Sequence, residues 1–435
     1  MLHADFLARL AQEYPKTAKA HDVRSLVIPT LISPTALSLP REWKDEAERL
    51  VFLFFNDIRE NQRASFAEPP HSRSEELRSQ APELPLPRNA SVLMSYDFHV
   101  DFSSDPKGRL RLIEINTNAS MSLLIDLMNG ERGLEPKDDT TDTHSLRCYG
   151  RRAKEVLMDD FAEELLTARG LPGYEIANVL QGARVVIVDD EPEKQKLFIE
   201  FLLYKELFEK RGATCEIVDR RDLEMRDGRL WAKAPTSEPS LGANDFGPID
   251  LVYNRTTDFY FEEPASAALR DAMLTAATVI SPNPYDYRML ADKDRLVEWS
   301  GDGALEKIYG MKPEDADRIR AALLRTRETK SIDPELLWKE RKGLMFKPRH
   351  AYGGKGVFRG SSISRGAFEG VLASDSLAQD FVPAPTTKID GVEFKYDLRF
   401  FAYRDNVHVA CARLYQGQMT NATTPGGGVT SIHWV

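Results

Sequence analysis

The stretch RLIEINTNAS, residues 111–120, contains the pattern from which the rest of this chain is most readily understood. Glu114 and Asn116 stand two residues apart in a segment with strand-like alternation, so their side chains share one face. A carboxylate beside an amide oxygen is a ligand pair that suits Mg²⁺. On its own, the same pattern also fits the solvated face of an ordinary strand.

Just upstream, residues 92–102 alternate between apolar and polar side chains, which predicts a half-buried strand. Asp97 and Asp101 lie on the polar face of that strand. The turn SSDPKG, residues 103–108, then predicts a hairpin over residues 92–116. In such a hairpin the polar face adjoins Glu114, and one of the two aspartates is expected to complete a magnesium site.

A glycine turn follows a lysine near the end of the chain, in LMFKPRHAYGGKGVFRG, residues 344–360. Lys347 ends one predicted strand, and the turn leads into a second. Backbone N–H groups of such a turn can hold phosphate oxygens, although the spacing is not that of a P-loop, and an ordinary solvated hairpin stays an alternative. The residues of the turn that are expected to contact phosphate are Gly353, Gly354, Lys355 and Gly356.

Two arginines come next, each on a predicted strand. Arg399 shares a strand face with Asp397, Arg413 ends the following strand, and Asn421 precedes a second glycine cluster. Arginines that converge on glycine loops suit anionic oxygens, whereas either arginine alone also fits a surface charge paired with a nearby acid.

The middle of the chain predicts a βαβ unit. ARVVIVDD, a helical stretch over residues 193–211 and TCEIVD follow one another, and DLVYNR adds a strand from residue 250. The topology is Rossmann-like, but the turn DDEPEK has carboxylates where a dinucleotide site has glycines. We therefore expect a substrate-binding domain here, and a helical cover from the N-terminal residues.

Composition narrows the class of protein. The chain has 435 residues, 42% of them hydrophobic, which is enough for several cores. A net charge of −10 argues against nucleic acid as a partner. There is no secretory signal and no apolar run long enough to span a bilayer, so we expect a cytoplasmic protein without a membrane partner. Three separated cysteines agree with reduced core thiols.

Taken in order, these elements resemble the ATP-grasp superfamily, whose members share a strand lysine, a glycine loop, a hinge strand, a D-x-R strand and an asparagine–glycine loop. An earlier ATP lysine of the family matches Lys293 in ADKDRL. The magnesium strand, which normally comes last, here lies upstream as EINT. That order is similar to that of eukaryotic-type glutathione synthetases, with VYNR, FKP and GGGV following in turn. The hinge strand matches Gln379, Asp380, Phe381 and Val382.

The resemblance implies an α/β (α+β) architecture: a circularly permuted ATP-grasp fold with a Rossmann-like substrate domain. It also implies an enzyme that uses ATP and Mg²⁺ to join a small-molecule carboxylate to an amine through an acyl phosphate. The expected domains are residues 1–90 as the helical cover, 91–178 as the permuted part with the magnesium strands, 179–281 as the substrate domain and 282–435 as the ATP-binding subdomains.

Residue roles follow from the resemblance in the same way. Lys293 and Lys347 are expected at the phosphates, and Glu114 and Asn116, with Asp97 or Asp101, at magnesium. Arg399, Arg413 and Asn421 are the expected catalytic residues, and the substrate residues are Tyr253, Arg255, Gly427 and Gly428.

The chain departs from the glutathione synthetases at several positions, which leaves its product open. His350, Ala351 and Tyr352 stand where that family has a glutamate ligand of magnesium, and Ser95 replaces a substrate-binding arginine. A kinase that uses the same site, and a noncatalytic nucleotide-binding module, stay as alternatives. The identities of the substrates and the oligomeric state, with a homodimer as one option, are not determined by the sequence.

Overall fold

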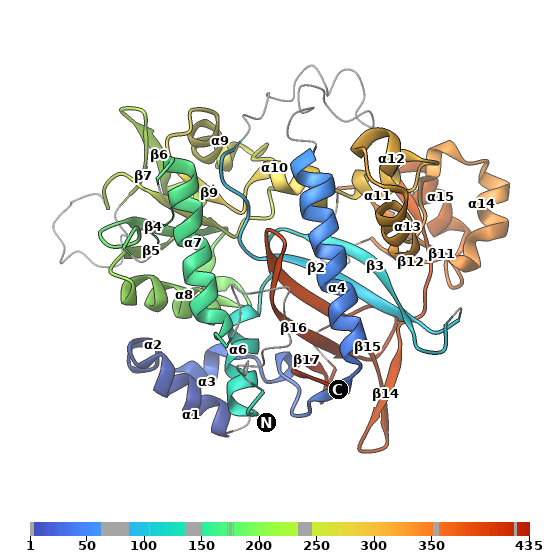
Figure 1. Cartoon of the computed structure of the whole chain (residues 1–435), viewed down its shortest axis with the longest axis horizontal. Helices are drawn as coiled ribbons and strands as arrows, with labels where there is room; N and C mark the ends of the chain where they lie inside the picture. The colour runs from blue at the N-terminus through green and yellow to red at the C-terminus, as the bar shows by residue number, and fades with distance from the viewer. Residues whose placement is uncertain are drawn as a thin grey trace.

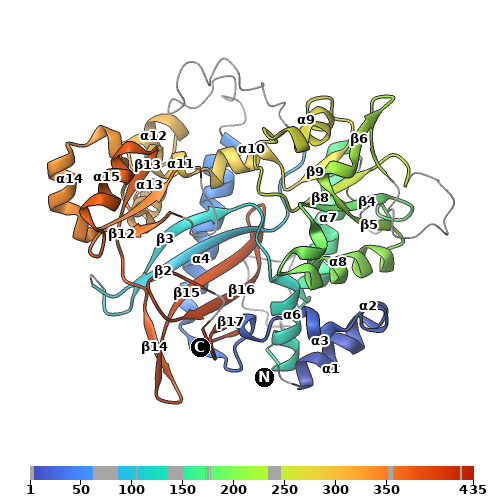
Figure 2. The same ribbon diagram turned by 180° about the vertical axis from the view of Figure 1, so that it is seen from behind.

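The structure is a computed structural model, seen from opposite sides in Figures 1 and 2. Three sheets lie side by side, with the largest in the middle (Figure 2). The predicted turn residues Gly353, Gly354 and Lys355 lie outside the described residues. The structure describes residues 4–61, 87–103, 105–134, 150–171, 173, 176, 178–233, 246–350, 356–421 and 424–435.

The central sheet has six antiparallel strands and contains the predicted hairpin. β2 pairs with β3, and β2 also pairs with β15 so that Asp97 stands opposite Arg399. This pairing confirms that the upstream hairpin lies beside the arginine strands. The strand order is β17-β16-β15-β2-β3, with β14 beside β15. Their bounds are β2 Met94–Asp101, β3 Arg109–Asn116, β14 Thr386–Ile389, β15 Val392–Tyr403, β16 Asn406–Tyr415 and β17 Gly428–Thr430.

A β-bulge in β3 determines toward which face of the sheet the neighbouring side chains point. Asp97 pairs with Glu114, but its neighbour Phe98 pairs with Leu112, so Ile113 has no partner on β2. The extra residue lets Glu114 share the face of Asp97 while Leu112 faces the core with Phe98. Without it, a strict two-residue alternation could not satisfy both pairs.

The two faces of the central sheet are covered differently. α4, Arg41–Leu53, crosses one face (Figure 1) and buries Trp43, Ala47 and Leu50 against Tyr96 and Phe98. The other face is covered in part by α6, Ser122–Glu131, and α7, Ala153–Arg169, which pack against Phe401 and Cys411. The part of that face not covered by these helices carries Asp97, Glu114 and Arg399. The π-helix η2, Phe54–Glu60, continues α4.

A second, smaller sheet lies beside β3. Its order is β10-β13-β11-β12, and Leu337, Phe346 and Phe368 form its core with α14 and α15. Lys347 lies on β11. The bounds are β10 Thr326–Glu328, β11 Leu344–Pro348, β12 Phe358–Arg359, β13 Ser376–Asp380, α14 Pro334–Glu340 and α15 Arg365–Ala373. The helices that precede it are α10 Pro284–Asp286, η8 Tyr287–Ala291, α11 Lys293–Trp299, α12 Ala304–Tyr309 and α13 Pro313–Ala322.

The third sheet is parallel, as the predicted βαβ pattern requires. Its order is β5-β4-β8-β9, and α8 connects β4 to β5. Buried valine and isoleucine side chains of β4 pack on both of its faces, which explains the continuous apolar run in VVIV. The bounds are β4 Arg184–Asp189, α8 Phe198–Lys210, β5 Thr214–Asp219, β8 Leu251–Asn254, α9 Ala267–Leu274 and β9 Val279–Ser281. Between β5 and β8, the strands β6 Leu223–Arg226 and β7 Arg229–Ala232 form a separate two-stranded sheet.

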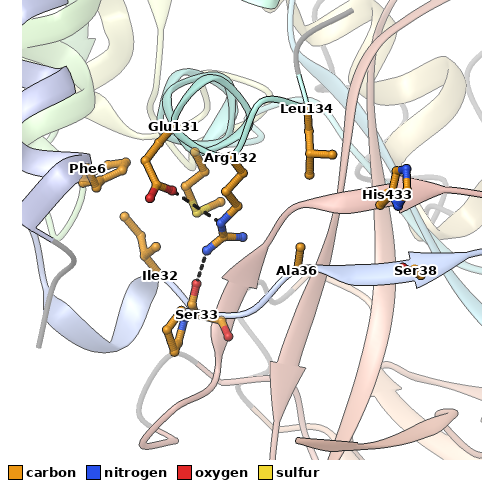
Figure 3. Close-up of a pocket in the computed structure, with 11 residues that line it drawn as sticks. Phe6, Ile32, Ser33, Ala36, Ser38, Glu131, Arg132, Leu134 and His433 are labelled. Carbon is orange, nitrogen blue, oxygen red and sulfur yellow. Dashed lines mark hydrogen bonds and ion pairs between the residues drawn. The ribbon is translucent and has the colours of Figure 1, made fainter.

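The N-terminal part of the chain packs against the C-terminal strand. β1, Leu37–Leu39, pairs in parallel with β18, Ile432–Trp434. At the end of α6, Arg132 donates to the carbonyl oxygen of Ser33 at 2.5 Å, beside a cavity that Phe6 and His433 also line (Figure 3). The first helices are α1 Ala4–Glu13, α2 Pro15–Ala20 and α3 Val23–Leu26.

Among the described residues, no helix combines the length and the apolar character that a membrane crossing needs. The predicted domain boundaries stay a prediction, as does the circular permutation, which the pairing of β2 with β15 supports.

Candidate active site

A cavity of about 440 Å³ opens between the central sheet and the smaller sheet. Residues from β3, from the start of α11, from β11 and β13, and from β15 and β16 line it, so it collects segments that are up to three hundred positions apart in the sequence. The predicted site residues that line this cavity are Glu114, Asn116, Lys293, Lys347, Gln379, Asp380, Phe381, Val382, Arg399 and Arg413.

Two arginines at the cavity wall are held by two aspartates on neighbouring strands. Arg399 donates to both carboxylate oxygens of Asp97, at 2.8 and 2.7 Å. Arg413 donates to Asp97 at 2.9 Å and to both oxygens of Asp397, at 2.6 and 3.0 Å. The geometry follows from strand register, because Asp97 stands opposite Arg399 and Asp397 opposite Arg413.

Burial by itself would raise the pKa of Asp97, but the charges and hydrogen bonds of Arg399 and Arg413 lower it below its ordinary value. Asp97 is therefore a stable anion that orients two guanidinium groups. Thr420, which sequence reasoning did not single out, donates to Asp397 at 2.6 Å. Its distance from the D-x-R pattern in sequence left no signal by which to find it.

Two lysines face the cavity, one from a strand and one from a helix. Lys347 of β11 donates to the carbonyl oxygen of Ile113 at 3.3 Å, and Lys293 at the start of α11 donates to that of Arg349 at 3.4 Å. Burial lowers the pKa of both lysines, while the negative charge of Glu114 partly opposes that effect. Two desolvated ammonium groups near one carboxylate form a site that favours an anion such as a polyphosphate.

The residues around Glu114 fit a hard divalent ion whose coordination is completed by a ligand. In the described part of the chain, no side chain is hydrogen-bonded to the Glu114 carboxylate, and the side-chain amide of Asn116 donates only to Asp97, at 3.4 Å. Within the same residues, no three His, Cys, Asp or Glu side chains cluster as a metal site. One carboxylate and one amide, with phosphate oxygens and water, agree with how Mg²⁺ is usually bound beside nucleotides.

Neither aspartate predicted as the third ligand stands free beside Glu114. Asp97 is engaged by the two arginines. Asp101 lies four residues farther along β2, about 13 Å at ~3.3 Å per residue, and its carboxylate accepts from the backbone and side chain of Ser103 at 2.9 and 2.6 Å. The metal-binding role of both aspartates stays a prediction.

The expected hinge strand crosses between the two sheets. Gln379 donates to Ile113 at 3.4 Å, and the Phe381 N–H bonds to the carbonyl oxygen of Gly343 at 2.8 Å. Nδ1 of His99, on β2, lies 3.0 Å from the Val382 carbonyl oxygen and donates a proton to it in one tautomer. In the sequence His99 lies between Asp97 and Asp101 on the same strand face, but a lone histidine is usually structural and Mg²⁺ sites avoid imidazole, so it is not predicted as a ligand.

Several other predicted residues lie outside the lining of this cavity, as Asp97 and Asp101 do. Tyr253 and Arg255 are buried at the end of β8 in the parallel sheet. Asn421 donates to the carbonyl oxygen of Gln416 at 2.9 Å. Gly427 and Gly428 are buried, and a Cβ at Gly428 would lie 2.5 Å from the Thr30 carbonyl oxygen, so the N-terminal segment covers this glycine turn. The roles of these residues stay predictions.

Gly356, the last residue of the first glycine turn, also lies outside the lining residues. Its φ of +70° is a left-handed conformation, and a Cβ there would come within 2.9 Å of Pro348. A glycine is therefore required at this position by the backbone, whether or not the turn contacts phosphate.

No protein-family model and no curated protein matches the sequence. The structure of a glutathione synthetase-like effector from Globodera pallida matches with a TM-score of 0.53 and 11% identity, over 98% of this chain and 97% of that chain.

More distant matches are a gamma-glutamylcysteine synthetase candidate from Methylobacillus flagellatus KT and the ATP-grasp ligase PsnB. The first has a TM-score of 0.46 and 9% identity over 92% of this chain and 88% of that chain. The second has a TM-score of 0.28 and 13% identity over 55% of this chain and 78% of that chain. The chain has an ATP-grasp-like fold, as its sequence resemblance predicted.

Proposed function

We propose that the chain is an ATP-dependent ligase that joins a small-molecule carboxylate to an amine through an acyl phosphate. One observation carries the proposal: one buried and one partly buried lysine, two oriented arginines and the pair Glu114–Asn116 converge on one cavity between two sheets of an ATP-grasp-like fold. That set offers cationic groups for a polyphosphate and oxygen ligands for a divalent ion. The name of the Globodera pallida protein points to the same class of reaction.

On this proposal the nucleotide lies between the hinge strand and β3. Lys293 and Lys347 hold the phosphates, and the apolar side chains of Met345 and Phe381 line the wall beside them. Gly353, Gly354 and Lys355, which fall outside the described residues, are proposed to cover the phosphates, as the sequence resemblance implies. Closing the cavity in this way excludes water from the reacting groups.

The proposed reaction has two steps. A carboxylate oxygen of the substrate attacks the γ-phosphorus, and the bond from that phosphorus to the ADP oxygen breaks. The amine nitrogen then attacks the carbonyl carbon, phosphate leaves with the bonding electrons, and the proton lost by the amine goes to that phosphate. Bound Mg²⁺, held by Glu114 and Asn116, would draw charge from the phosphate oxygens in the first step.

Arg399 and Arg413 are the residues of this chain that are proposed to stabilise the transferred phosphoryl group. Asp97 and Asp397 hold both guanidinium groups in place before any ligand arrives, so no reorganisation is needed at the moment of transfer. An arginine oriented in advance stabilises developing negative charge more effectively than a mobile one.

The experiment that tests the proposal is ADP release from MgATP across a panel of carboxylates, each with and without a panel of amines. Release that requires both substrates, together with an amide product, supports the ligase. A stable phosphorylated product without an amine would favour the kinase instead. Nucleotide binding without turnover on any pair would favour the noncatalytic module. Lys347→Ala serves as the control for turnover at this site.

A further inference from the structure

The loop that follows β3, residues 117–121, is held by side chains from the parallel sheet. Arg255, directly after β8, donates from Nη1 to the carbonyl oxygen of Ala119 at 3.0 Å and from Nη2 to the hydroxyl of Ser120. Asn118 makes the return contact, because its amide donates to the carbonyl oxygen of Thr256. The loop starts one residue after Asn116, so these bonds lie next to the proposed magnesium ligands.

The far end of the same loop is fixed by a buried carboxylate. Glu200 of α8 accepts from the backbone N–H groups of Met121, at 2.7 Å, and Leu123, at 3.0 Å, where α6 begins. Met121 has a φ of +88°, a left-handed conformation that a side chain rarely adopts. The loop is therefore held at both ends by the unit that contains the parallel sheet.

The arginine in this arrangement is buried and makes its shortest contacts with the loop. Arg255 is 7% exposed, its Nε has no hydrogen-bond partner, and among the described residues it forms no ion pair. Besides the loop, Nη1 donates to the Tyr253 hydroxyl at 3.4 Å, and the rings of Tyr253 and Phe201 lie 5.5 and 5.8 Å from the guanidinium carbon. The two shortest hydrogen bonds of this guanidinium go to loop oxygens, in a fork geometry that favours a role in fixing that loop.

We infer that Arg255 is a positioning residue for the magnesium side of the site: by holding Ala119 and Ser120, it sets where Glu114 and Asn116 stand. The inference rests on the proposed function, which gives those two residues their ligand. It differs from direct contact between Arg255 and a substrate carboxylate, which the sequence resemblance implies.

The test is the affinity of the full chain for ADP, measured by calorimetry with and without Mg²⁺. In Arg255→Lys the charge is kept, but one ammonium group cannot hold both loop oxygens in the geometry of the guanidinium fork. The affinity for ADP without Mg²⁺ should be unchanged. The gain in affinity that Mg²⁺ gives should fall by about tenfold or more, as for residues that orient metal ligands.

Arg220→Lys is the matched control. Arg220 is also 7% exposed and follows β5 of the same sheet, but it bonds to Asp190 and Ser266 and not to the loop. It should keep the full response to Mg²⁺. An equal loss in both variants would trace the effect to general loosening of the sheet and overturn the inference. Should Arg255→Lys not fold, Ser120→Ala removes one of the two acceptors and should cost about threefold.

Glu114→Gln separates failure of this inference from failure of the proposed function. A wild-type chain whose ADP affinity does not respond to Mg²⁺ removes the proposed function itself. A different outcome overturns the inference alone: the affinity of the wild type responds to Mg²⁺, Glu114→Gln loses that response and Arg255→Lys keeps it. Direct contact of Arg255 with substrate is then favoured.

Discussion

Glu114 and Asp97 stand opposite each other on β3 and β2, yet their environments give them different properties. Asp97 accepts hydrogen bonds from two arginines, whereas no described side chain is hydrogen-bonded to Glu114. A carboxylate surrounded by donors is a structural anion, and one left open beside two lysines is available to a ligand. Variants at the two positions should therefore differ in whether they affect stability or activity.

Glu114→Gln should leave the fold intact and remove activity. The change keeps the shape of the side chain, and we expect the free energy of unfolding to change by about 1 kcal/mol or less, because only the attraction of Glu114 for Lys293 and Lys347 is lost. Turnover with MgATP should fall by about a hundredfold or more. Thermal unfolding and ADP production on the same preparation provide both readouts. A fully active variant with normal magnesium dependence would contradict the assignment.

In contrast to Glu114→Gln, the variant Asp97→Asn should mainly reduce stability. Removing the charge of this buried carboxylate leaves Arg399 without its counter-ion and Arg413 with Asp397 alone, so we expect a loss of about 3–5 kcal/mol in the free energy of unfolding. Urea denaturation measures it. Asp101→Asn on the same strand is the control, since its bonds are to Ser103, and its cost should be about 1 kcal/mol. Similar costs for the two variants would mean that the arginine pairs contribute little.

At the scale of elements, the bulge in β3 links strand geometry to the cavity. Ile113, the unpaired residue, presents its carbonyl oxygen to both Lys347 and Gln379 of the smaller sheet. The irregularity that turns Glu114 toward the cavity also provides the acceptor that holds the facing strands. One local break in pairing thus serves both purposes.

α7 is joined to the central sheet by a buried carboxylate that should make stability depend on pH. Glu164 accepts from the Asn89 amide, the Ala90 N–H and the Tyr403 hydroxyl, at 2.8, 3.0 and 2.8 Å. Burial raises the pKa of Glu164 to about 7, although hydrogen bonds from the side chains of Asn89, Tyr403 and Ser281 favour its charged form. The protonated form is therefore favoured in the folded chain relative to the unfolded one, whose pKa is near 4.5.

Because the folded pKa lies above the unfolded one, the contribution of Glu164 is fully present below about pH 4.5 and is lost as the pH rises to about 7. Glu164→Gln cannot ionise and should flatten this part of the curve. The free energy of unfolding at pH 5 and at pH 8, for both proteins, checks the effect. An identical pH dependence in the two proteins would assign the titration to another group.

At the scale of the whole molecule, the cavity lies between two sheets, so a ligand in it contacts both sheets. Lys347 from the smaller sheet and Glu114 from the central one face the same space. A nucleotide held by both would stabilise their relative position, and the melting temperature should rise with its concentration.

Lys347→Ala should weaken binding of MgADP without destabilising the free protein. A charge-assisted contact is worth about 1.5–3 kcal/mol, which predicts a loss of about ten- to a hundredfold in affinity. The unliganded protein should not lose stability in proportion, because burial already disfavours the charged lysine. Calorimetry measures affinity, and Lys342→Ala, an exposed residue just before β11, is the control. Unchanged affinity in Lys347→Ala would argue against a nucleotide at this position.

The amino-acid sequence by itself determined the features that depend on neighbours along the chain. Alternation in residues 92–116 predicted the hairpin, and the apolar run VVIV followed by a helix predicted the parallel unit. The order of the lysines, the D-x-R strand and EINT predicted which residues meet, and most of those residues do line one cavity. These patterns are local because period and turn chemistry are set within a few residues.

Only the tertiary structure decided which partner each side chain finds. Asp97 is held by arginines about three hundred residues away, Arg255 is bonded to Ala119, and Gly428 is packed against Thr30. The bulge at Ile113 that turns Glu114 toward the cavity has no signature in RLIEIN. Long-range register and the packing of one sheet on another set these contacts, because a one-residue shift in pairing changes the partner of every side chain on the strand.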